Sequence, residues 1–337
     1  MKDKKKYSRR EFISASVKGA AVLSATSMLG NEAFGAFEKP GGIPRRTLGK
    51  TGMSVSILSF GGGSQFLKNP DGEWEKLLQK ALDSGINLFD TAPEYTIANY
   101  FKPGEVKKSV GSSEERFGEI LSPYRKNIHL ITKIDGRDPA TVKKSVEDSL
   151  KNMKTDYLDA LLIHAISDKD TVADLEKGVY REIADLKRQG IVKFIGFSSM
   201  DSGGRSKDIL QNLDFDIAMM AINPTKYRNY ASIAVPVARE KGVGVIAIKV
   251  LRDIVGKDAK PAELFEYVWS EAGVAAAMVA HVGMKTFDEN IKLAVKYGKA
   301  TAASVNRQEM EFRLASYAGP HALSWARPDY RDGGIIV

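Results

Sequence analysis

The chain has 337 residues, of which 43% are hydrophobic and 27% are charged, proportions ordinary for a soluble globular protein. This excludes a collagen-like or wholly disordered chain, and the absence of cysteine excludes disulfides, iron–sulfur clusters, thiolate zinc sites and cysteine nucleophiles. Residues 1–35 hold seven basic and three acidic side chains and so contribute half of the net charge of +8.

The amino-terminal segment has the pattern of an export signal peptide. Ser8-Arg9-Arg10-Glu11-Phe12 is followed by a weakly apolar stretch over residues 19–30, and small residues then allow cleavage after Gly35. The apolar stretch is too short to span a bilayer. The pattern resembles a bacterial twin-arginine (Tat) signal. That resemblance implies recognition by the Tat export machinery, no stable membrane span, and a periplasmic mature chain.

Two other interpretations of this segment stay open at the level of sequence. Residues 1–35 could be a basic tail of a protein that remains in the cytosol. A polybasic run can also bind nucleic acid, but no basic patch with interleaved aromatic residues recurs later in the chain. We therefore expect no nucleic-acid partner, and a lack of cysteine is compatible with an oxidising compartment.

The remaining chain alternates predicted strands and helices after a short hairpin at residues 46–55. The expected strands are 57–61, 87–91, 128–133, 157–164, 192–198, 217–223, 243–249 and 275–282. The expected helices are 73–84, 113–121, 140–153, 179–188, 207–212, 233–241, 262–271 and 287–299. Eight such units favour a closed (β/α)8 TIM barrel over residues 46–300, with an open doubly wound sheet as the alternative.

Helix ends and the remaining tail complete this domain prediction. Ser112 with Glu115, and Thr286 with Glu289, match the capping box that begins a helix, and Asp138 precedes a first-turn proline. Residues 301–337 form a carboxyl-terminal tail with one expected helix near 306–317 and an irregular end. We expect that tail to cover the mouth of the barrel or a neighbouring element.

Ionisable side chains stand at the ends of three consecutive predicted strands. Asp90 ends the second strand, Lys133 the third and His164 the fourth, and Tyr95 follows in the loop after Asp90. Active sites of barrels gather where the strands end. Alone, each of these residues is more often a cap, a solvated lysine or a structural histidine. Together on adjacent strands, they predict one catalytic cavity.

Several segments resemble the aldo-keto reductase family. They are residues 85–95 (GINLFDTAPEY), 145–150 with 157–159 (SVEDSL and YLD), and 190–198 (GIVKFIGFS), preceded by LGKTG at 48–52. The resemblance runs in order over roughly residues 46–295. It implies an (α/β)8 barrel that transfers hydride from NADPH to a carbonyl, and it places the family's catalytic tetrad at Asp90, Tyr95, Lys133 and His164.

The chemistry of a carbonyl reduction fits that tetrad. Hydride addition leaves negative charge on oxygen, so a proton donor must lie beside it. A free tyrosine, with a pKa of about 10, holds its proton too tightly, and an adjacent ammonium lowers such a pKa by roughly 1–3 units. We therefore expect Lys133 to lower the pKa of Tyr95, Asp90 to hold Lys133, and His164 to bind the substrate oxygen.

The family resemblance also implies a cofactor site, with departures from the family pattern. The expected cofactor-binding residues are Gly61, Gly62, Ser198, Ser199, Lys249, Gly283, Lys285 and Thr286. Ser198-Ser199 stands where the family usually has Ser-Asn for the nicotinamide amide. Met219 replaces a frequent glutamine, and Ile248 lies where an aromatic residue often stacks on nicotinamide. The glycines after the first strand allow close backbone approach, although a tight turn explains them as well.

Lys285 points to the choice of dinucleotide. It lies in a segment that resembles the family's loop around the adenosine 2′-phosphate, and its positive charge at a helix start favours NADP(H) over NAD(H). The alternative is a solvated lysine with no ligand. No metal site is expected, because His129, His164, His281 and His321 show no paired spacing. A metal-dependent barrel hydrolase is therefore disfavoured.

The sequence leaves two functions from different classes open. The first is an exported NADP-dependent enzyme that reduces a small-molecule carbonyl. The second is a catalytically weak or inactive barrel that acts as an exported binding or accessory protein, motivated by the altered nicotinamide pocket. The complete tetrad favours the enzyme, and the sequence does not identify the carbonyl substrate.

Overall fold

The fold is taken from a computed structural model that describes residues 42–337 apart from 103, 106–109, 300–303, 333–334 and 337. The expected signal over residues 1–35 lies outside this part of the chain. No helix among the described residues is long and apolar enough to cross a membrane.

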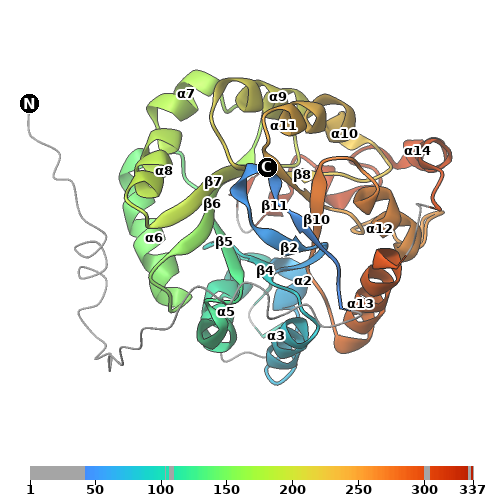
Figure 1. Cartoon of the computed structure of the whole chain (residues 1–337), viewed down its shortest axis with the longest axis horizontal. Coiled ribbons are helices and arrows are strands. Elements are labelled where there is room, and N and C mark those ends of the chain that lie inside the picture. The colour runs from blue at the N-terminus through green and yellow to red at the C-terminus, as the bar shows by residue number, and fades with distance from the viewer. Residues whose placement is uncertain (1–41, 103, 106–109, 300–303, 333–334, 337) are drawn as a thin grey trace, which may run out of the picture.

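Eight parallel strands close into a barrel, in the order β10-β3-β4-β5-β6-β7-β8-β9 (Figure 1). They are β3(Leu58–Gly61), β4(Leu88–Asp90), β5(His129–Ile134), β6(Leu158–Ile166), β7(Val192–Ser199), β8(Ile217–Ala221), β9(Gly244–Ile248) and β10(Val274–Val279). The TIM barrel predicted from the sequence is confirmed. The open doubly wound sheet is wrong, because β10 pairs with β3 and leaves no edge.

Helices surround this barrel and join its strands (Figure 1). The longer ones are α3(Trp74–Asp83), α5(Ser113–Leu121), α6(Pro139–Asn152), α7(Val172–Lys177), α8(Val179–Arg188), α9(Gly203–Asn212), α11(Val235–Glu240), α12(Pro261–Trp269), α13(Met284–Gly298) and α14(Arg307–Leu314). Single turns of helix are α2(Ser64–Leu67), α4(Ile97–Tyr100) and α10(Tyr230–Ile233). Short 3₁₀ turns are η1(Gly49–Thr51), η2(Ser122–Tyr124), η3(Tyr227–Asn229), η4(Ala315–Tyr317) and η5(Ser324–Ala326).

The helix boundaries follow their caps. Ser112 accepts a hydrogen bond from the Glu115 N–H at 3.2 Å and Asp138 from the Ala140 N–H at 2.9 Å, as expected from the sequence. The cap predicted at Thr286 is wrong, because α13 begins at Met284 and Thr286 lies inside its first turn. The helix expected over 207–212 begins earlier, since Ser202 caps it.

Alternation along the strands separates two apolar regions. Leu88, Ile131, Leu162, Met219 and Ile246 point into the barrel and pack together with the residues of the amino-terminal hairpin. The residues between them pack outward against the helices. Lys133 and His164 share the parity of Ile131 and Leu162, so both side chains face the barrel interior at the carboxyl ends of their strands.

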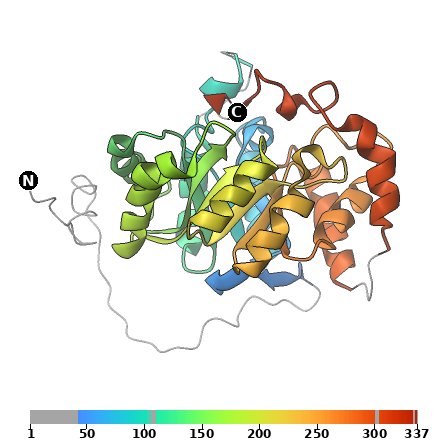
Figure 2. The same ribbon diagram turned by 90° about the horizontal axis from the view of Figure 1, so that it is seen from above.

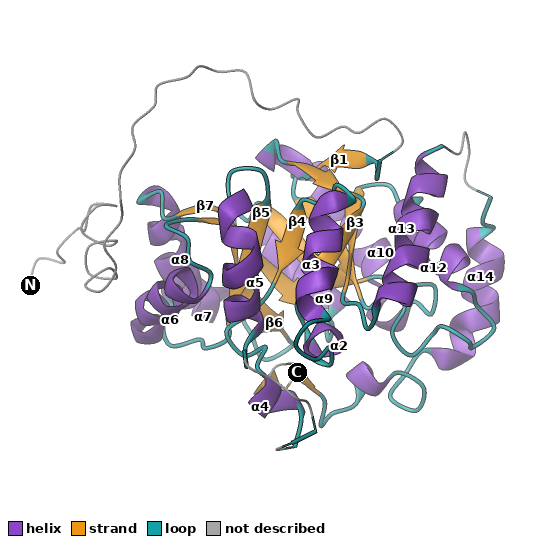
Figure 3. Ribbon diagram, turned by 90° about the horizontal axis from the view of Figure 1, so that it is seen from below, coloured by secondary structure: helices purple, strands orange, loops and turns teal. Residues whose placement is uncertain are grey.

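The two ends of the barrel are closed differently (Figures 2 and 3). The hairpin of β1(Arg45–Thr47) and β2(Ser54–Ser56) covers the amino-terminal end. The carboxyl-terminal tail returns over the opposite end, where β11(Arg331–Asp332) pairs with β12(Ile335–Ile336). Trp325 anchors the tail, since its ring is 2% exposed and packs edge-on against Tyr227 at 5.4 Å. The tail therefore lies over the mouth where the polar strand ends meet.

Candidate active site

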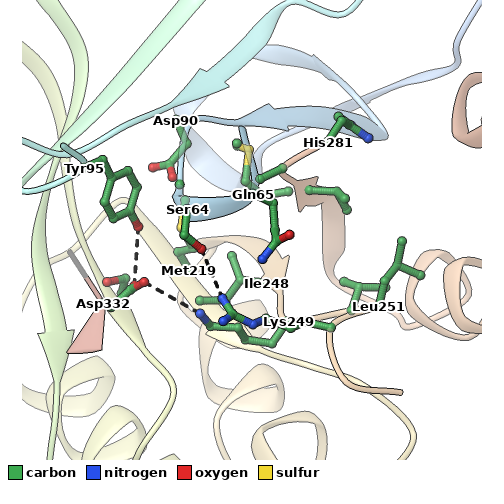
Figure 4. Close-up of a pocket in the computed structure, with 18 of the residues that line it drawn as sticks. Ser64, Gln65, Asp90, Tyr95, Met219, Ile248, Lys249, Leu251, His281 and Asp332 are labelled. Atoms are coloured by element: carbon green, nitrogen blue, oxygen red, sulfur yellow. Dashed lines mark hydrogen bonds and ion pairs between the residues drawn. The ribbon is translucent and has the colours of Figure 1, made fainter. Parts of the chain in front are cut away.

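A cavity of about 550 Å³ opens at the carboxyl ends of the strands. Asp90, Tyr95, Lys133 and His164 all line it, although they lie on three strands and a loop of the chain. The parallel register brings them to one level, since Asp90 pairs with Ile131 and Lys133 with Leu162. Figure 4 shows Asp90 and Tyr95 facing the same space.

Lys133 connects the carboxylate to the phenol. Its Nζ donates to Asp90 Oδ2 at 2.8 Å and to the Thr91 carbonyl at 2.7 Å, and it lies 3.4 Å from the Tyr95 hydroxyl. The Lys133 side chain is only 1% exposed. Burial raises the pKa of Asp90, and the neighbouring Lys133 opposes that rise. A buried ammonium is thus held by one carboxylate and one carbonyl, with the phenol as its third neighbour.

The pKa of Tyr95 differs from the expectation based on sequence. It is raised well above its usual value, first by burial and then by the negative charge of Asp332. The expectation that this pKa lies below its usual value is therefore wrong for the arrangement observed here, because burial and Asp332 outweigh any lowering by Lys133. Asp90 lies closer to Lys133 than Tyr95 does and compensates its charge, while the anion on the other side of the phenol favours the protonated form.

His164 lies between two carboxylates. Its Nδ1 contacts Asp135 Oδ1, and its Nε2 lies 3.2 Å from Asp332 Oδ2 and 3.5 Å from the Tyr95 hydroxyl. Burial alone would lower the pKa of His164, but Asp135 and then Asp332 outweigh it, so the pKa is raised. The imidazole therefore favours its charged form.

Asp332 reaches the catalytic side chains from the far end of the chain (Figure 4). The Tyr95 hydroxyl donates to Asp332 Oδ2 at 3.4 Å, and Lys249 Nζ lies 3.8 Å from Oδ1. The neighbouring Tyr330 hydroxyl accepts hydrogen bonds at 3.0 Å from both Lys249 and Arg252. The Asp332 carboxylate thus occupies the point between Tyr95 and His164.

Half of the expected cofactor-binding residues line the cavity, namely Gly61, Ser198, Lys249 and Thr286. Met219 and Ile248, where the family pattern is altered, line it as well. Ser198 is engaged structurally too, because its Oγ accepts a hydrogen bond from the Ala165 N–H at 2.9 Å.

The other four expected residues have different surroundings. A Cβ on Gly62 would lie 2.0 Å from Ser113 Oγ, so packing requires this glycine. Ser199 Oγ bonds to the Ile166 carbonyl and the Tyr230 hydroxyl, both at 2.9 Å. The Gly283 N–H donates to Asn69 Oδ1 at 2.8 Å. Lys285 is exposed in the first turn of α13.

The sequence prediction missed several polar residues around this cavity. Gln65, Arg252, His281, Asn290 and Asp332 also line it, and Asp135 supports it through His164. A signal for Asp135 was present, because it lies two residues beyond Lys133 and shares its parity. No local signal marks Asp332, whose position depends on the path of the tail. Among the described residues, no group of three histidine, aspartate or glutamate side chains could hold a metal ion.

Comparisons with known proteins agree with this geometry. The family model "Aldo/keto reductase family" matches residues 58–258. L-galactose dehydrogenase of Arabidopsis thaliana is 26% identical over 265 residues, which cover 77% of this chain and 81% of that protein. The oxidoreductase YqkF of Bacillus subtilis is 27% identical over 168 residues, and this match spans only 49% of its length.

Solved structures give the same picture. A putative aldo-keto reductase from Pseudomonas aeruginosa is 29% identical, with a TM-score of 0.62, over 76% of this chain and 96% of that one. The holo form of aldo-keto reductase AKR11C1 from Bacillus halodurans is 20% identical with a TM-score of 0.62, over 82% of this chain and 96% of that one, and shares the fold. The closed barrel, the side chains at its mouth and the family match over most of the barrel all agree. This chain belongs to the aldo/keto reductase family.

Proposed function

We propose that this protein reduces an aldehyde or ketone to an alcohol, with NADP(H) as hydride donor and Tyr95 as general acid. One observation carries the proposal. The Tyr95 hydroxyl and His164 Nε2 lie 3.5 Å apart and both face the same point in the cavity, while Lys133 and Asp90 support the phenol from behind. A carbonyl oxygen at that point would meet a proton donor and a charged hydrogen-bond donor together.

Each side chain has a role in the proposed reaction. Tyr95 gives its hydroxyl proton to the substrate oxygen as negative charge develops there. His164 Nε2 donates a hydrogen bond to the same oxygen. Lys133 stabilises the phenolate left on Tyr95, and Asp90 keeps Lys133 charged and in place. A bound reduced nicotinamide supplies the hydride.

The raised pKa of Tyr95 is compatible with this role. It keeps the phenol protonated at neutral pH, which a general acid requires. Asp332, the largest charged contributor to the rise, occupies the place of the substrate oxygen, so substrate binding removes it. The phenol then loses an anionic neighbour and keeps Lys133, which makes it a better proton donor.

The residues between β3, β9 and β10 fit an anionic dinucleotide. Gly61 and Gly63 leave that wall of the cavity without side chains, and Lys249 and Arg252 supply positive charge. His281 is buried, and in the part of the chain that the structure describes its Nε2 atom has no hydrogen-bond partner. Its Nδ1 lies 3.3 Å from the Asn290 side-chain amide. Such an unpaired polar atom in a cavity wall fits a site that is completed by a ligand.

The preference for NADP(H) over NAD(H) rests on positive charge near the start of α13. Thr286 lines the cavity, and Lys285 is exposed beside it in the first turn, where free N–H groups favour a phosphate. Titration with both cofactors tests this preference. We expect tighter binding of NADP(H), and Lys285→Ala to remove most of the difference; equal affinities in the unmodified protein would contradict it.

Exchange of the general acid tests the proposed reaction. Tyr95→Phe should lower kcat/KM for carbonyl reduction by roughly 10²-fold or more, because no group replaces the phenolic proton, while fold and cofactor affinity stay unchanged. Tyr100→Phe is the matched control, since its ring lies 6.2 Å from that of Tyr95 and we assign it no chemistry. Full activity in Tyr95→Phe would remove Tyr95 from this role.

The choice of substrates for that assay follows the relatives' names. One relative is a D-threo-aldose 1-dehydrogenase from a Pseudomonas species, 24% identical over 245 residues, and another is L-galactose dehydrogenase. Aldoses therefore belong in the first panel, beside simple aldehydes and ketones. A chain that binds cofactor and reduces none of these substrates would favour the alternative function, an inactive barrel that acts as a binding or accessory protein. The Asp332 carboxylate between Tyr95 and His164 would then be the structural reason for the inactivity.

A further inference from the structure

His164 is the most enclosed member of the catalytic group, and both of its ring nitrogens face carboxylate oxygens. Asp135 Oδ1 contacts Nδ1, and Asp332 Oδ2 lies 3.2 Å from Nε2. A neutral imidazole has one N–H and one acceptor nitrogen, whereas ionised carboxylates only accept hydrogen bonds. Both contacts are therefore satisfied at once only by an imidazolium, which has two N–H donors.

The Asp135 carboxylate is held in its contact with His164 Nδ1. Its second oxygen, Oδ2, is buried and has no hydrogen-bond partner among the described residues, and its side chain is 12% exposed. Arg137 fixes the backbone on both sides of the pair, since its guanidinium donates to the Asp135 carbonyl at 3.0 Å and to the His164 carbonyl at 2.8 Å. The carboxylate is thus held against Nδ1 by a short loop after β5.

Of the two carboxylates around His164, only Asp135 would remain beside the ring when a substrate is bound. Asp332 occupies the point where a substrate oxygen would bind, so it leaves when substrate enters. Asp135 lies on the opposite side of the ring and stays during a reaction. The other ionisable groups near the ring are Lys133, Asp90, Tyr95 and Glu94. Of these groups, Lys133 carries a positive charge, and it therefore opposes protonation of the imidazole.

We propose that Asp135 is a positioning residue of the active site: it keeps His164 doubly protonated, so that Nε2 always donates to the substrate oxygen. This inference rests on the proposed carbonyl reduction. A hydrogen bond from an imidazolium is charge-assisted and stronger than one from a neutral ring. Without the carboxylate, Nε2 becomes an acceptor in one tautomer and cannot stabilise an oxyanion.

The protonation state of His164 is measured directly by NMR on protein carrying 15N-labelled histidine. The chain has 4 histidines, and the spectrum of His164→Gln assigns the signal. We expect the unmodified protein to show an imidazolium at neutral pH. Asp135→Asn keeps a hydrogen-bond acceptor at Nδ1 without its charge, and should move the titration of His164 down by about one pH unit or more. An unchanged titration would overturn the proposal.

Two further variants separate this role from a general effect on structure. Asp138→Asn is the matched control, because it makes the same change in the same loop, and asparagine also caps the start of α6 well; it should leave the titration unchanged. Asp135→Glu restores the charge and should recover most of the shift. If Asp332→Asn moves the titration of His164 and Asp135→Asn does not, the tail and not Asp135 sets the charge of the ring.

Kinetics add a readout that depends on the reaction. Asp135→Asn should lower kcat about tenfold or more and move the alkaline limit of the pH profile downward, with cofactor affinity unchanged. A protein without reductase activity would defeat the proposed function, while the NMR titration would still decide the role of Asp135. A titration of His164 that is unchanged in Asp135→Asn would defeat only the inference.

Discussion

Charged side chains in the nearly closed mouth of the barrel are costly for stability. The Lys133 and Asp90 side chains are 1% and 5% exposed, and the desolvation of each ion costs several kcal/mol before pairing compensates it. A pair of apolar residues would fill the same space at no such cost. The arrangement is therefore better explained by the chemistry it supports than by a contribution to folding.

His281 gives a residue-scale prediction about acid stability. Burial lowers its pKa from 6.5 to about 3, so the folded state favours the neutral ring. Its contribution is complete above pH 6.5 and is lost as the pH falls from 6.5 toward 3, by at most about 1.4 kcal/mol per pH unit. In urea unfolding at pH 7, 6 and 5, the free energy of unfolding should fall less steeply in His281→Gln than in the unmodified protein.

The slope, not the absolute stability, is the quantity to compare. His164 has a raised pKa and contributes in the opposite direction, but equally in both proteins, so its effect cancels in the difference. His321→Gln, a change at an exposed histidine, should leave the slope unaltered. Parallel pH profiles for the His281→Gln variant and the unmodified protein would show that His281 is not the group that charges.

At the scale of elements, the barrel strands and the tail contribute to the site in different ways. Lys133 pairs with Leu162 of the next strand, and His164 follows Ile163, which pairs with a strand on each side. Strand β11 of the tail reaches the same point from the solvent side, and the Tyr330 hydroxyl connects it to Lys249 and Arg252. The tail thus contacts the cations of the proposed cofactor site and fills the point between Tyr95 and His164.

Removal of the tail should therefore open the site. Deletion of residues 328–337 leaves the buried Trp325 in place and removes Asp332. The Asp332 carboxylate competes with the substrate oxygen for hydrogen bonds from the Tyr95 hydroxyl and His164 Nε2. We expect KM for the carbonyl to fall by about tenfold, the equivalent of one such hydrogen bond. Asp332→Asn in the full chain should reproduce part of the effect in steady-state kinetics. A higher KM in the deletion would mean that the tail helps to bind the substrate.

At the scale of the whole molecule, the barrel and the segment before it carry separate information. The barrel belongs to the aldo/keto reductase family, and we propose that residues 1–35 direct its export by the Tat pathway to the periplasm. The twin-arginine pattern supports this, since that pathway accepts chains that are already folded. Such a route would allow the cofactor to be bound before export.

Export is tested in cells with a functional twin-arginine pathway. Exchange of Arg9 and Arg10 for lysine should keep the protein in the cytoplasmic fraction, while the unmodified chain should be recovered in the periplasm with Ala36 as its first residue by mass spectrometry. Exchange of Lys4 and Lys5 for arginine preserves the same charge outside the motif and should change nothing. An uncleaved, cytoplasmic protein without any exchange would support the cytosolic interpretation.

The barrel architecture and the meeting of Asp90, Tyr95, Lys133 and His164 in one cavity were predictable from the sequence. Apolar periodicities of 2 and 3.6 depend on neighbours along the chain, so eight strand–helix units could be recognised and closed into a barrel. Strand ends of a parallel barrel meet at one mouth, which was enough to bring Asp90, Lys133 and His164 together. The Thr286 cap failed because Gly283 allowed α13 to begin three residues earlier than its local pattern indicates.

Only the tertiary structure decided how these side chains are charged and which cofactor candidates reach the cavity. Gly62 and Ser199 have the right positions along their strands, but close packing and buried hydrogen bonds engage them elsewhere. Asp332 meets Tyr95 across 237 residues of sequence, and its charge adds to the effect of burial, so the phenol's pKa is raised where a lowered one was expected. The electrostatics of a buried group depend on every charge that surrounds it in space, and the path of a long tail is not encoded in local periodicity.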